Sequence, residues 1–215
     1  MITRVADEVV LASTGAGSAG SAGCGGRAAD AQQEVVLRDG LRVVVRPLDA
    51  GDEAAIVSWF AGLGAETRYA RFLAPLERLD RRTRSELARV DHFDHEAIAA
   101  VAPDGTTVGI ARYIRIARRR SAEVAVAVAV ADDWRGRGIA SMLLDRVAAR
   151  ARAAGVEQLT AICLATNYTV IRLLSRLGPT TVGPSDAGLV DVRIDLMSTR
   201  PDRSPSRAAS DGRRD

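Results

Sequence analysis

The sequence predicts a mixed α/β sandwich, in which one central sheet lies between layers of helices. Three observations support this fold class. Short runs rich in valine, isoleucine and alanine have the length of strands. Longer segments carry apolar residues at helical spacing, and they alternate with the strands along the chain. The chain has 215 residues, 47% of them hydrophobic, which is enough to bury one core of ordinary size.

Both ends of the chain are expected to be flexible tails. Residues 13–30 consist mainly of glycine, serine and alanine, and residues 200–215 mix proline, serine, arginine and aspartate without periodicity. Such segments bury too little apolar surface to offset the entropy that ordering would cost. We therefore expect one folded domain over residues 34–199, with tails at residues 1–33 and 200–215.

The first part of this domain is expected to hold a hairpin and three helices. An Asp-Gly turn at residues 38–40 separates two strand-like runs, residues 35–37 and 41–46. Asp49 is a candidate N-cap for a helix that ends at Gly62. Apolar spacing predicts two further helices, at residues 65–72 and 83–90.

The second part is expected to alternate strands and helices. A strand at residues 122–131 alternates valine and alanine, so both of its faces are apolar and it should lie in the middle of the sheet. Two strands joined by a turn precede it, and Gly155 should end the helix that follows it. The remaining elements are strands at residues 96–102, 107–116, 156–164 and 189–197, and helices at residues 137–154 and 167–177.

The charge balance argues against a nucleic-acid-binding protein. All 30 basic residues are arginine, but 27 acidic residues are interspersed among them and the net charge is only +3. A mixed, solvated surface explains this pattern better than a basic binding face does. The arginine run at residues 118–120 fits a solvated turn between strands.

Other patterns exclude further classes of protein. Cys24 and Cys163 show neither metal-site nor disulfide spacing, so a reducing compartment is expected. His92 and His95 have no second ligand cluster, so no metal site is predicted. No run approaches the roughly 18 apolar residues of a membrane span, and the N-terminal segment makes a poor secretory signal. We therefore expect a cytoplasmic protein without a membrane partner.

One turn has the composition of a pyrophosphate-binding site. It follows the valine-alanine strand and Asp132-Asp133-Trp134, and it opens a helix. Its two glycines allow close approach of the backbone, and the free N–H groups at a helix start attract anions. The Rossmann spacing is absent because Ser141 stands at the third glycine position, and a chain without lysine has no P-loop lysine. The residues of the turn are Arg135, Gly136, Arg137, Gly138, Ile139 and Ala140.

This turn resembles the Arg/Gln-x-x-Gly-x-Gly/Ala motif of the GNAT superfamily of N-acetyltransferases, at Arg135, Gly138 and Ala140. The resemblance covers nearly all of residues 34–199. Residues 45–47, 58–72 and 90–94 look like bacterial protein-lysine acetyltransferases of the Pat type. The resemblance implies the GNAT fold, which is a mostly antiparallel sheet with one splayed parallel strand pair and flanking helices, some of them a lid over the substrate side.

The resemblance also implies acetyl-CoA as the acetyl donor. The pyrophosphate would lie on the turn, and the pantetheine arm would lie beside Val128, Ala129 and Val130, whose backbone would polarise the thioester carbonyl. Asn167 would hydrogen-bond near the arm, although an ordinary helix N-cap explains this asparagine equally well.

Glu123 is the candidate general base, because it resembles the glutamate of the Ala-Glu-Val-Ala segment in Pat-type enzymes. It stands two residues further from the turn than the family spacing, which keeps it on the same face of the strand. The alternative is a glutamate paired with one of the arginines at residues 118–120. Leu174 occupies the position at which many GNAT enzymes carry a tyrosine as general acid.

The predicted function is transfer of an acetyl group from acetyl-CoA to an amine, by direct attack in a ternary complex. A protein lysine is the leading acceptor because of the Pat-like segments. Two alternatives remain open: a small-molecule amine as the acceptor, and an acyl-CoA-binding sensor without catalytic activity. The shifted position of Glu123 and the leucine at position 174 motivate the sensor.

Overall fold

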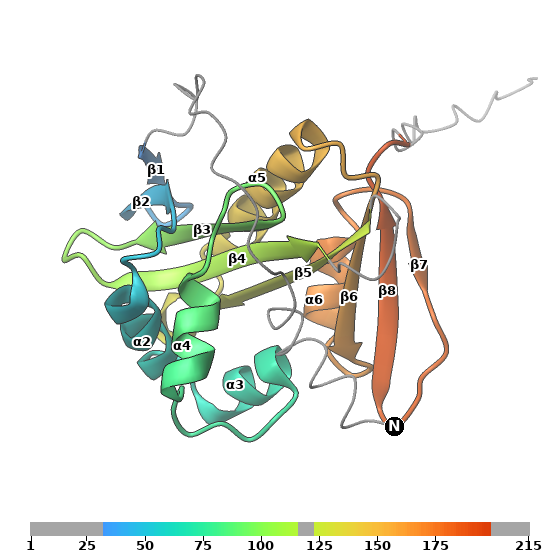
Figure 1. The fold of residues 1–215 in the computed structure, drawn as a ribbon, viewed down its shortest axis with the longest axis horizontal. Coiled ribbons are helices and arrows are strands. Elements are labelled where there is room, and N and C mark those ends of the chain that lie inside the picture. The colour runs from blue at the N-terminus through green and yellow to red at the C-terminus, as the bar shows by residue number, and fades with distance from the viewer. Residues whose placement is uncertain (1–31, 116–122, 199–215) are drawn as a thin grey trace, which may run out of the picture.

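The computed structural model describes residues 32–115 and 123–198. Residues 1–31 of the first expected tail, with Cys24, the whole expected tail at residues 200–215 and the arginine run at residues 118–120 lie outside it. Within these residues, one sheet runs in the order β1-β2-β3-β4-β5-β6-β8-β7 (Figure 1). Every neighbouring pair is antiparallel except β5 and β6, which confirms the predicted fold class. The strands are β1 Gln33–Val36, β2 Arg42–Pro47, β3 His95–Val101, β4 Thr107–Arg115, β5 Glu123–Val130, β6 Gln158–Leu164, β7 Thr180–Val182 and β8 Leu189–Asp195.

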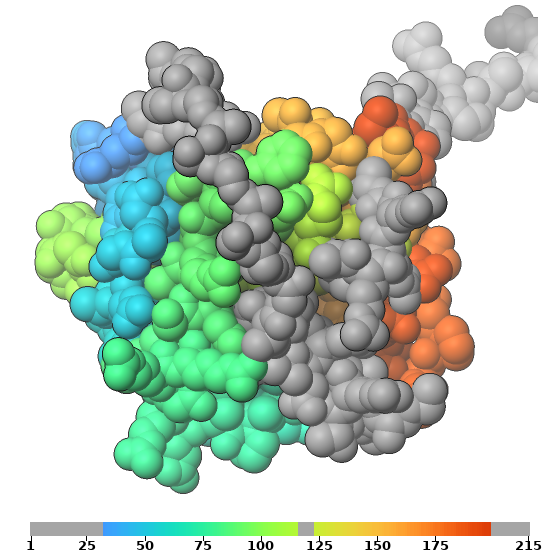
Figure 2. All heavy atoms as spheres, in the orientation of Figure 1, coloured from blue at the N-terminus to red at the C-terminus, as the bar shows by residue number. Residues whose placement is uncertain are grey.

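Helices cover both faces of the sheet. Three short helices lie over one face, where their side chains form much of the surface in Figure 2. A long helix and a short one lie on the other face. No helix in the described ranges is long and apolar enough to cross a membrane. The first layer consists of α2 Glu53–Ala61, α3 Ala65–Phe72 and α4 Arg81–Ala88, and the second of α5 Ile139–Ala153 and α6 Tyr168–Leu174, with the 3-10 turn η1 Asp132–Trp134 before α5.

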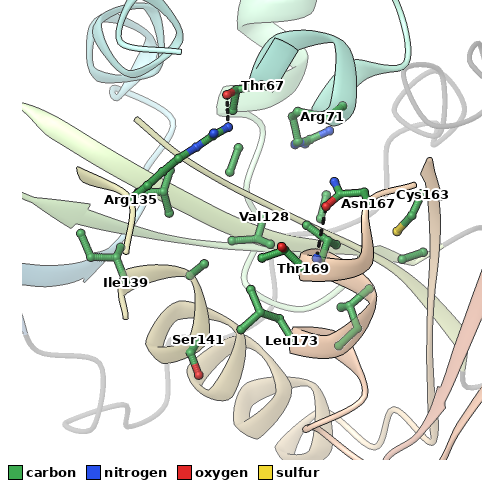
Figure 3. Close-up of a pocket in the computed structure, with 18 of the residues that line it drawn as sticks. Thr67, Arg71, Val128, Arg135, Ile139, Ser141, Cys163, Asn167, Thr169 and Leu173 are labelled. Atoms are coloured by element: carbon green, nitrogen blue, oxygen red, sulfur yellow. Dashed lines mark hydrogen bonds between the residues drawn. The ribbon is translucent and has the colours of Figure 1, made fainter. Parts of the chain in front are cut away.

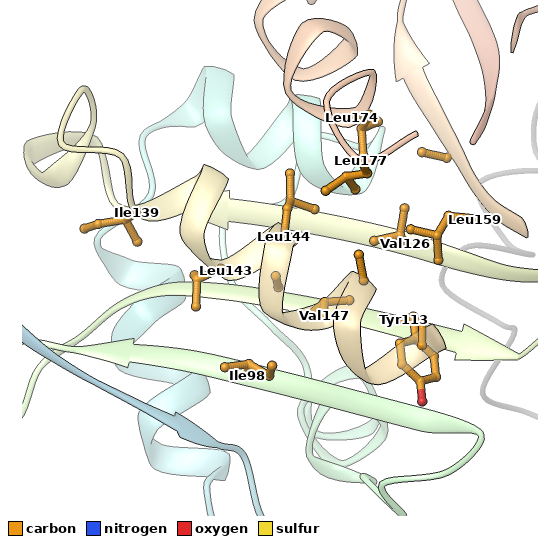
Figure 4. Packing of buried hydrophobic residues seen from close by; sticks show 14 of the residues in the cluster. Ile98, Tyr113, Val126, Ile139, Leu143, Leu144, Val147, Leu159, Leu174 and Leu177 are labelled. Carbon is orange, nitrogen blue, oxygen red and sulfur yellow. The ribbon is translucent and has the colours of Figure 1, made fainter. Parts of the chain in front are cut away.

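The valine-alanine strand β5 lies between β4 and β6 and contributes to a hydrophobic core on each face. Val124, Val126 and Val130 pack with α5, whose Leu143 and Val147 point at the sheet in Figure 4. Ala129 packs with the other core, where the indole N–H of Trp59 donates to its carbonyl at 3.2 Å. The prediction of a central strand with two apolar faces is therefore confirmed.

The parallel pair β5–β6 is splayed. The two strands pair only at Glu123–Gln158, Val124–Leu159 and Ala125–Thr160. Beyond these pairs β5 stays beside β4 up to Val130, and β6 stays beside β8 up to Leu164. The carboxyl halves of β5 and β6 therefore separate, as the resemblance implied, and leave room between them.

Several predicted boundaries are wrong by a few residues. The first helix begins at Glu53, not after Asp49, because the Asp52 carboxylate binds Arg46 at 2.7 Å and accepts the Asp49 N–H at 2.7 Å. These bonds hold residues 49–52 in a turn. Helix α6 ends at Leu174, and the short edge strand β7 was not predicted.

Candidate active site

A cavity of about 580 Å³ lies where β5 and β6 separate (Figure 3). Strand β5 lines it from Val126 to Val130, and the turn before α5 closes one end. Helix α3 contributes Thr67 and Arg71 from the other layer, and the start of α6 contributes Asn167. The cavity therefore joins the predicted anion-binding turn to the splay between the strands.

The turn has the backbone geometry that the sequence predicts for an anion site. Gly136 and Gly138 have φ of +78° and +89°, a region that side chains with a Cβ rarely occupy. Gly138 is the N-cap of α5, so the N-cap residue has no side chain that could bond the first N–H groups of this 15-residue helix. These N–H groups and the positive end of the helix dipole are suited to a pyrophosphate.

A polar network connects this turn to helix α3. Arg135 donates a hydrogen bond to the Thr67 hydroxyl, which donates to the Asp132 carboxylate. The same carboxylate accepts the Gly64 N–H at 3.1 Å, one residue before α3 begins, and lies 3.2 Å from Nε of Arg135. The position of α3 is therefore coupled to that of the turn.

The cavity brings together the predicted cofactor residues other than Arg137. That side chain lies over the Trp134 ring, 4.7 Å from its centroid, and its Nε is 3.2 Å from the Asp39 carboxylate. Asn167 lines the cavity and also caps α6 by accepting the Val170 N–H at 3.3 Å, so its two predicted roles are compatible. The predicted residues along the cavity are Val128, Ala129, Val130, Arg135, Gly136, Gly138, Ile139, Ala140 and Asn167.

Glu123 lies outside the lining of this cavity. It begins β5 opposite Gln158, where the two strands are still paired. By strand alternation it shares a face with Ala127 and Ala129, both of which line the cavity. A row of alanines therefore leads from the predicted base to the site.

The titratable side chains that line the cavity are four arginines and one cysteine: Arg38, Arg71, Arg135, Arg176 and Cys163. Burial raises the pKa of the Cys163 thiol to about 11, so the reactive thiolate is scarce at neutral pH. Leu174, at the position of the family's tyrosine acid, is 1% exposed and forms part of the wall. The site is strongly cationic.

Sequence patterns did not indicate a site role for Thr67, Arg71 or Arg38. Thr67 and Arg71 stand four residues apart on α3, so they lie on one side of the helix, and both belong to a segment that carried the family resemblance. That spacing could have identified them. Arg38 comes from the first hairpin, and only the fold brings it to the turn, where a Cβ on Gly138 would lie 3.5 Å from its Nε.

Beneath the α2–α4 layer, a buried histidine accepts a hydrogen bond from a buried arginine. His95 is 8% exposed, and its Nε2 lies 3.2 Å from Nη1 of Arg112. Burial and the charge of Arg112 lower the pKa of His95 to about 3. The imidazole is therefore neutral near pH 7, and Nε2 is the acceptor. No group of three metal-ligating side chains occurs in the described parts of the chain.

Protonation of His95 should make the folded state unstable in mild acid. Its pKa is lower in the folded state than the unfolded value of about 6.5, so the unfolded chain takes up the proton first and stability falls as the pH drops below 6.5. We expect a loss of about 2 kcal/mol in the free energy of unfolding between pH 7 and pH 5. Urea titrations of the wild type and His95→Gln at both pH values measure this loss.

The chain's only other histidine supplies the control. His92→Asn suits the positive φ of 59° at that position and should keep the loss that His95 causes, whereas His95→Gln should remove it. An equal loss in wild type and His95→Gln would show that other groups cause the acid sensitivity.

Comparison with known proteins identifies the family. The sequence matches the acetyltransferase (GNAT) family over residues 65–178. The chain belongs to this GNAT family. The matched range contains every residue that lines the cavity except Arg38, so the splay and the turn are the part of this chain that the GNAT family shares.

Two curated relatives and one solved structure are similar to this GNAT chain. The acetyltransferase Pat of Mycolicibacterium smegmatis is 30% identical over 164 residues, which are 75% of this chain and 48% of Pat. The chain thus spans about half the length of that relative. The acetyltransferase PA5475 of Pseudomonas aeruginosa is 30% identical over 66% of this chain and 77% of its own. The GNAT domain of S. lividans PAT is 32% identical, with a TM-score of 0.70, over 77% of this chain and 97% of that domain. Family and relatives place the chain among the acyltransferase enzymes.

Proposed function

We propose that this chain transfers an acetyl group from acetyl-CoA to the ε-amine of a protein lysine. The observation that carries the proposal is the single cavity that runs from the glycine turn to the splay between β5 and β6. A Cβ on Gly136 would meet no atom within 4 Å, so the space above the turn is open to a ligand. Two relatives are named acetyltransferases, which supports the transfer of an acetyl group. The choice of a protein lysine rests on the resemblance of residues 45–47, 58–72 and 90–94 to Pat-type protein-lysine acetyltransferases.

The residues of the chain suit acetyl-CoA in three places. The pyrophosphate would lie on the N–H groups of the turn, with the guanidinium groups of Arg135 and Arg38 beside it. The pantetheine arm would lie along Val128–Val130, where backbone groups no longer pair with β6. An N–H group there would stabilise the negative charge that develops on the thioester carbonyl oxygen.

The chemistry of the lining favours direct attack over an acyl-enzyme. The amine nitrogen forms a bond to the carbonyl carbon, the C–S bond breaks, and CoA leaves as the thiolate. An acyl-enzyme would require a nucleophile such as the thiol of Cys163, which lines the cavity. The raised pKa of this thiol makes it a poor nucleophile. The amine must lose a proton, because lysine has a pKa near ~10.4. We assign that proton to Glu123, through a chain of waters along the alanine row of β5.

Calorimetric titration with acetyl-CoA, followed by thiol release with a lysine-containing protein mixture, tests this function. The chain itself contains no lysine, so acetyl-lysine in the products must come from the acceptors. We expect saturable binding and thiol release that matches the acetyl-lysine formed. Binding without thiol release would favour the sensor alternative, which the position of Glu123 outside the cavity and the leucine at 174 motivate. Absence of binding would refute both.

A further inference from the structure

A buried arginine and a half-buried one carry charges that act on each other, and neither has a carboxylate partner in the described parts of the chain. Arg112 of β4 is 3% exposed, and its Nη2 donates to the Leu87 carbonyl at 3.0 Å. Its other partner is the neutral imidazole of His95. Arg71 of α3 lies over the Phe72 ring, 4.8 Å from its centroid. Within residues 32–115 and 123–198, neither guanidinium forms an ion pair with an acidic side chain.

The two charges act on each other. Burial lowers the pKa of Arg71 to about 10, and burial together with the charge of Arg71 lowers the pKa of Arg112 to about 9. Proteins seldom retain a desolvated charge without an opposite one, because removing an ion from water is costly. Neutral acceptors on Arg112 and an aromatic face under Arg71 offset only part of this cost. A bound anion would offset the rest.

Arg71 lies in a different part of the cavity from the turn, so an anion bound to Arg71 would be distinct from the pyrophosphate. In Figure 3, Arg71 lies near Asn167, toward the opposite end of the cavity from Ile139 and Ser141 at the start of α5. Arg112 is in register with Ala127, which lines the same cavity. Under the proposed function, this is the end where the acetyl group meets the acceptor amine.

A second groove leads to this end from the surface. It has a volume of about 780 Å³ and runs along α3, and it shares Ala70, Arg135 and Asn167 with the main cavity. Glu66 and Glu77 line this groove. Arg68 and Arg135 line it as well, so an approaching ammonium group meets carboxylates beside guanidinium groups. The groove joins the main cavity at Ala70, one residue before Arg71 on the helix.

We propose that Arg71, with Arg112 behind it, binds a carboxylate of the acceptor close to the reacting amine. This assignment rests on the proposed function and narrows its substrate class. The carboxylate comes from one of two sources: an acidic side chain beside the target lysine of a protein, or the α-carboxylate of a free amino acid. A guanidinium binds either one with two parallel hydrogen bonds.

Matched acceptor pairs test the assignment with the full chain. One pair consists of blocked peptides, Gly-Lys-Glu-Gly and Gly-Lys-Gln-Gly, and the other of free lysine and lysinamide. We expect kcat/KM, measured by thiol release at saturating acetyl-CoA, to favour the carboxylate member of one pair by about tenfold or more. In Arg71→Gln that preference should disappear, mainly through KM, and in Arg71→Lys it should survive in part.

The exposed Arg82 of α4 supplies the control, because Arg82→Gln removes the same charge from the solvent-exposed surface of α4. It should keep the wild-type preference. Preference within the peptide pair identifies an acidic neighbour of the lysine, and preference within the amino acid pair identifies a free amino acid. Equal rates within both pairs would overturn the assignment. So would a preference for succinyl-CoA over acetyl-CoA that is lost in Arg71→Gln, since the carboxylate would then belong to the donor.

Binding of the acetylated products, measured by calorimetry in the presence of CoA, separates this assignment from the proposed function. If no acceptor is acetylated, the proposed function fails. The carboxylate products should still bind more tightly than their neutral counterparts in the wild type and equally in Arg71→Gln. Equal binding in the wild type would refute the role of Arg71. Unchanged CoA affinity in Arg71→Gln shows that the variant is folded.

Discussion

Gly138→Asp is expected to weaken acetyl-CoA binding by about 100-fold or more, which corresponds to about 2.7 kcal/mol. The substitution places a carboxylate at the N-cap of α5, where the pyrophosphate would lie. Like charges would repel each other there, and the new carboxylate would compete for the free N–H groups and for Arg38. Aspartate is a favoured N-cap and tolerates positive φ better than most residues, so the fold should persist. Calorimetric titration measures the loss.

The other end of the same helix provides the control. Gly155 follows the C-cap of α5 with φ of +72°, and a Cβ there would meet no atom within 4 Å. Gly155→Asp therefore introduces the same side chain into a similar backbone conformation, away from the cavity. We expect acetyl-CoA affinity within about twofold of the wild type, since strain alone acts on stability. If both variants lose binding equally, the turn has no special role in anion binding.

The sequence predicts the turn and the central strand well because local physics determines both. Glycines at 136 and 138 stand where the backbone needs positive φ, and the helix that follows is apolar on the face toward the sheet. Val124 and Val126 pack on α5 because the strand period of two places them on one face. The splay was implied by family resemblance alone, because the spacing of valine and alanine does not indicate where two strands separate.

The arginine pair could not be predicted from local patterns. Arg71 and Arg112 are 41 positions apart, and only the packing of α3 on the sheet brings their charges within reach of each other. Isolated arginines on a helix or strand usually extend into solvent, so sequence gave no reason to expect burial. At Asp49 a local pattern was present but misleading. Asp49 has the residue type of a helix N-cap, but the pairing of Asp52 with Arg46 holds these residues in a turn instead.

Glu123→Gln is expected to lower kcat by about 100-fold or more at pH 7, with little change in acetyl-CoA affinity. The glutamate stands two strand positions before Ala125, the last residue of β5 that pairs with β6. Ala127, the residue on the same face that lines the cavity, is four positions from Glu123, about 13 Å along the strand, so the side chain needs a chain of waters to reach the site. Because glutamine cannot accept a proton, the amine would have to ionise by itself. Thiol release at saturating acetyl-CoA and acceptor measures kcat.

The pH profile and a neighbouring glutamate distinguish a base from a structural residue. The defect of Glu123→Gln should shrink as the pH approaches ~10, where lysine loses its proton without help. The exposed Glu157 precedes Gln158, which is paired with Glu123, so Glu157→Gln removes a carboxylate from the same end of the sheet. That variant should keep wild-type kcat at every pH.

A defect of Glu123→Gln that stays constant with pH would assign Glu123 a structural role. An unchanged kcat in Glu123→Gln would mean that the proton leaves by another path. The two extra residues between Glu123 and the turn would then have displaced the family's base from its place in the mechanism.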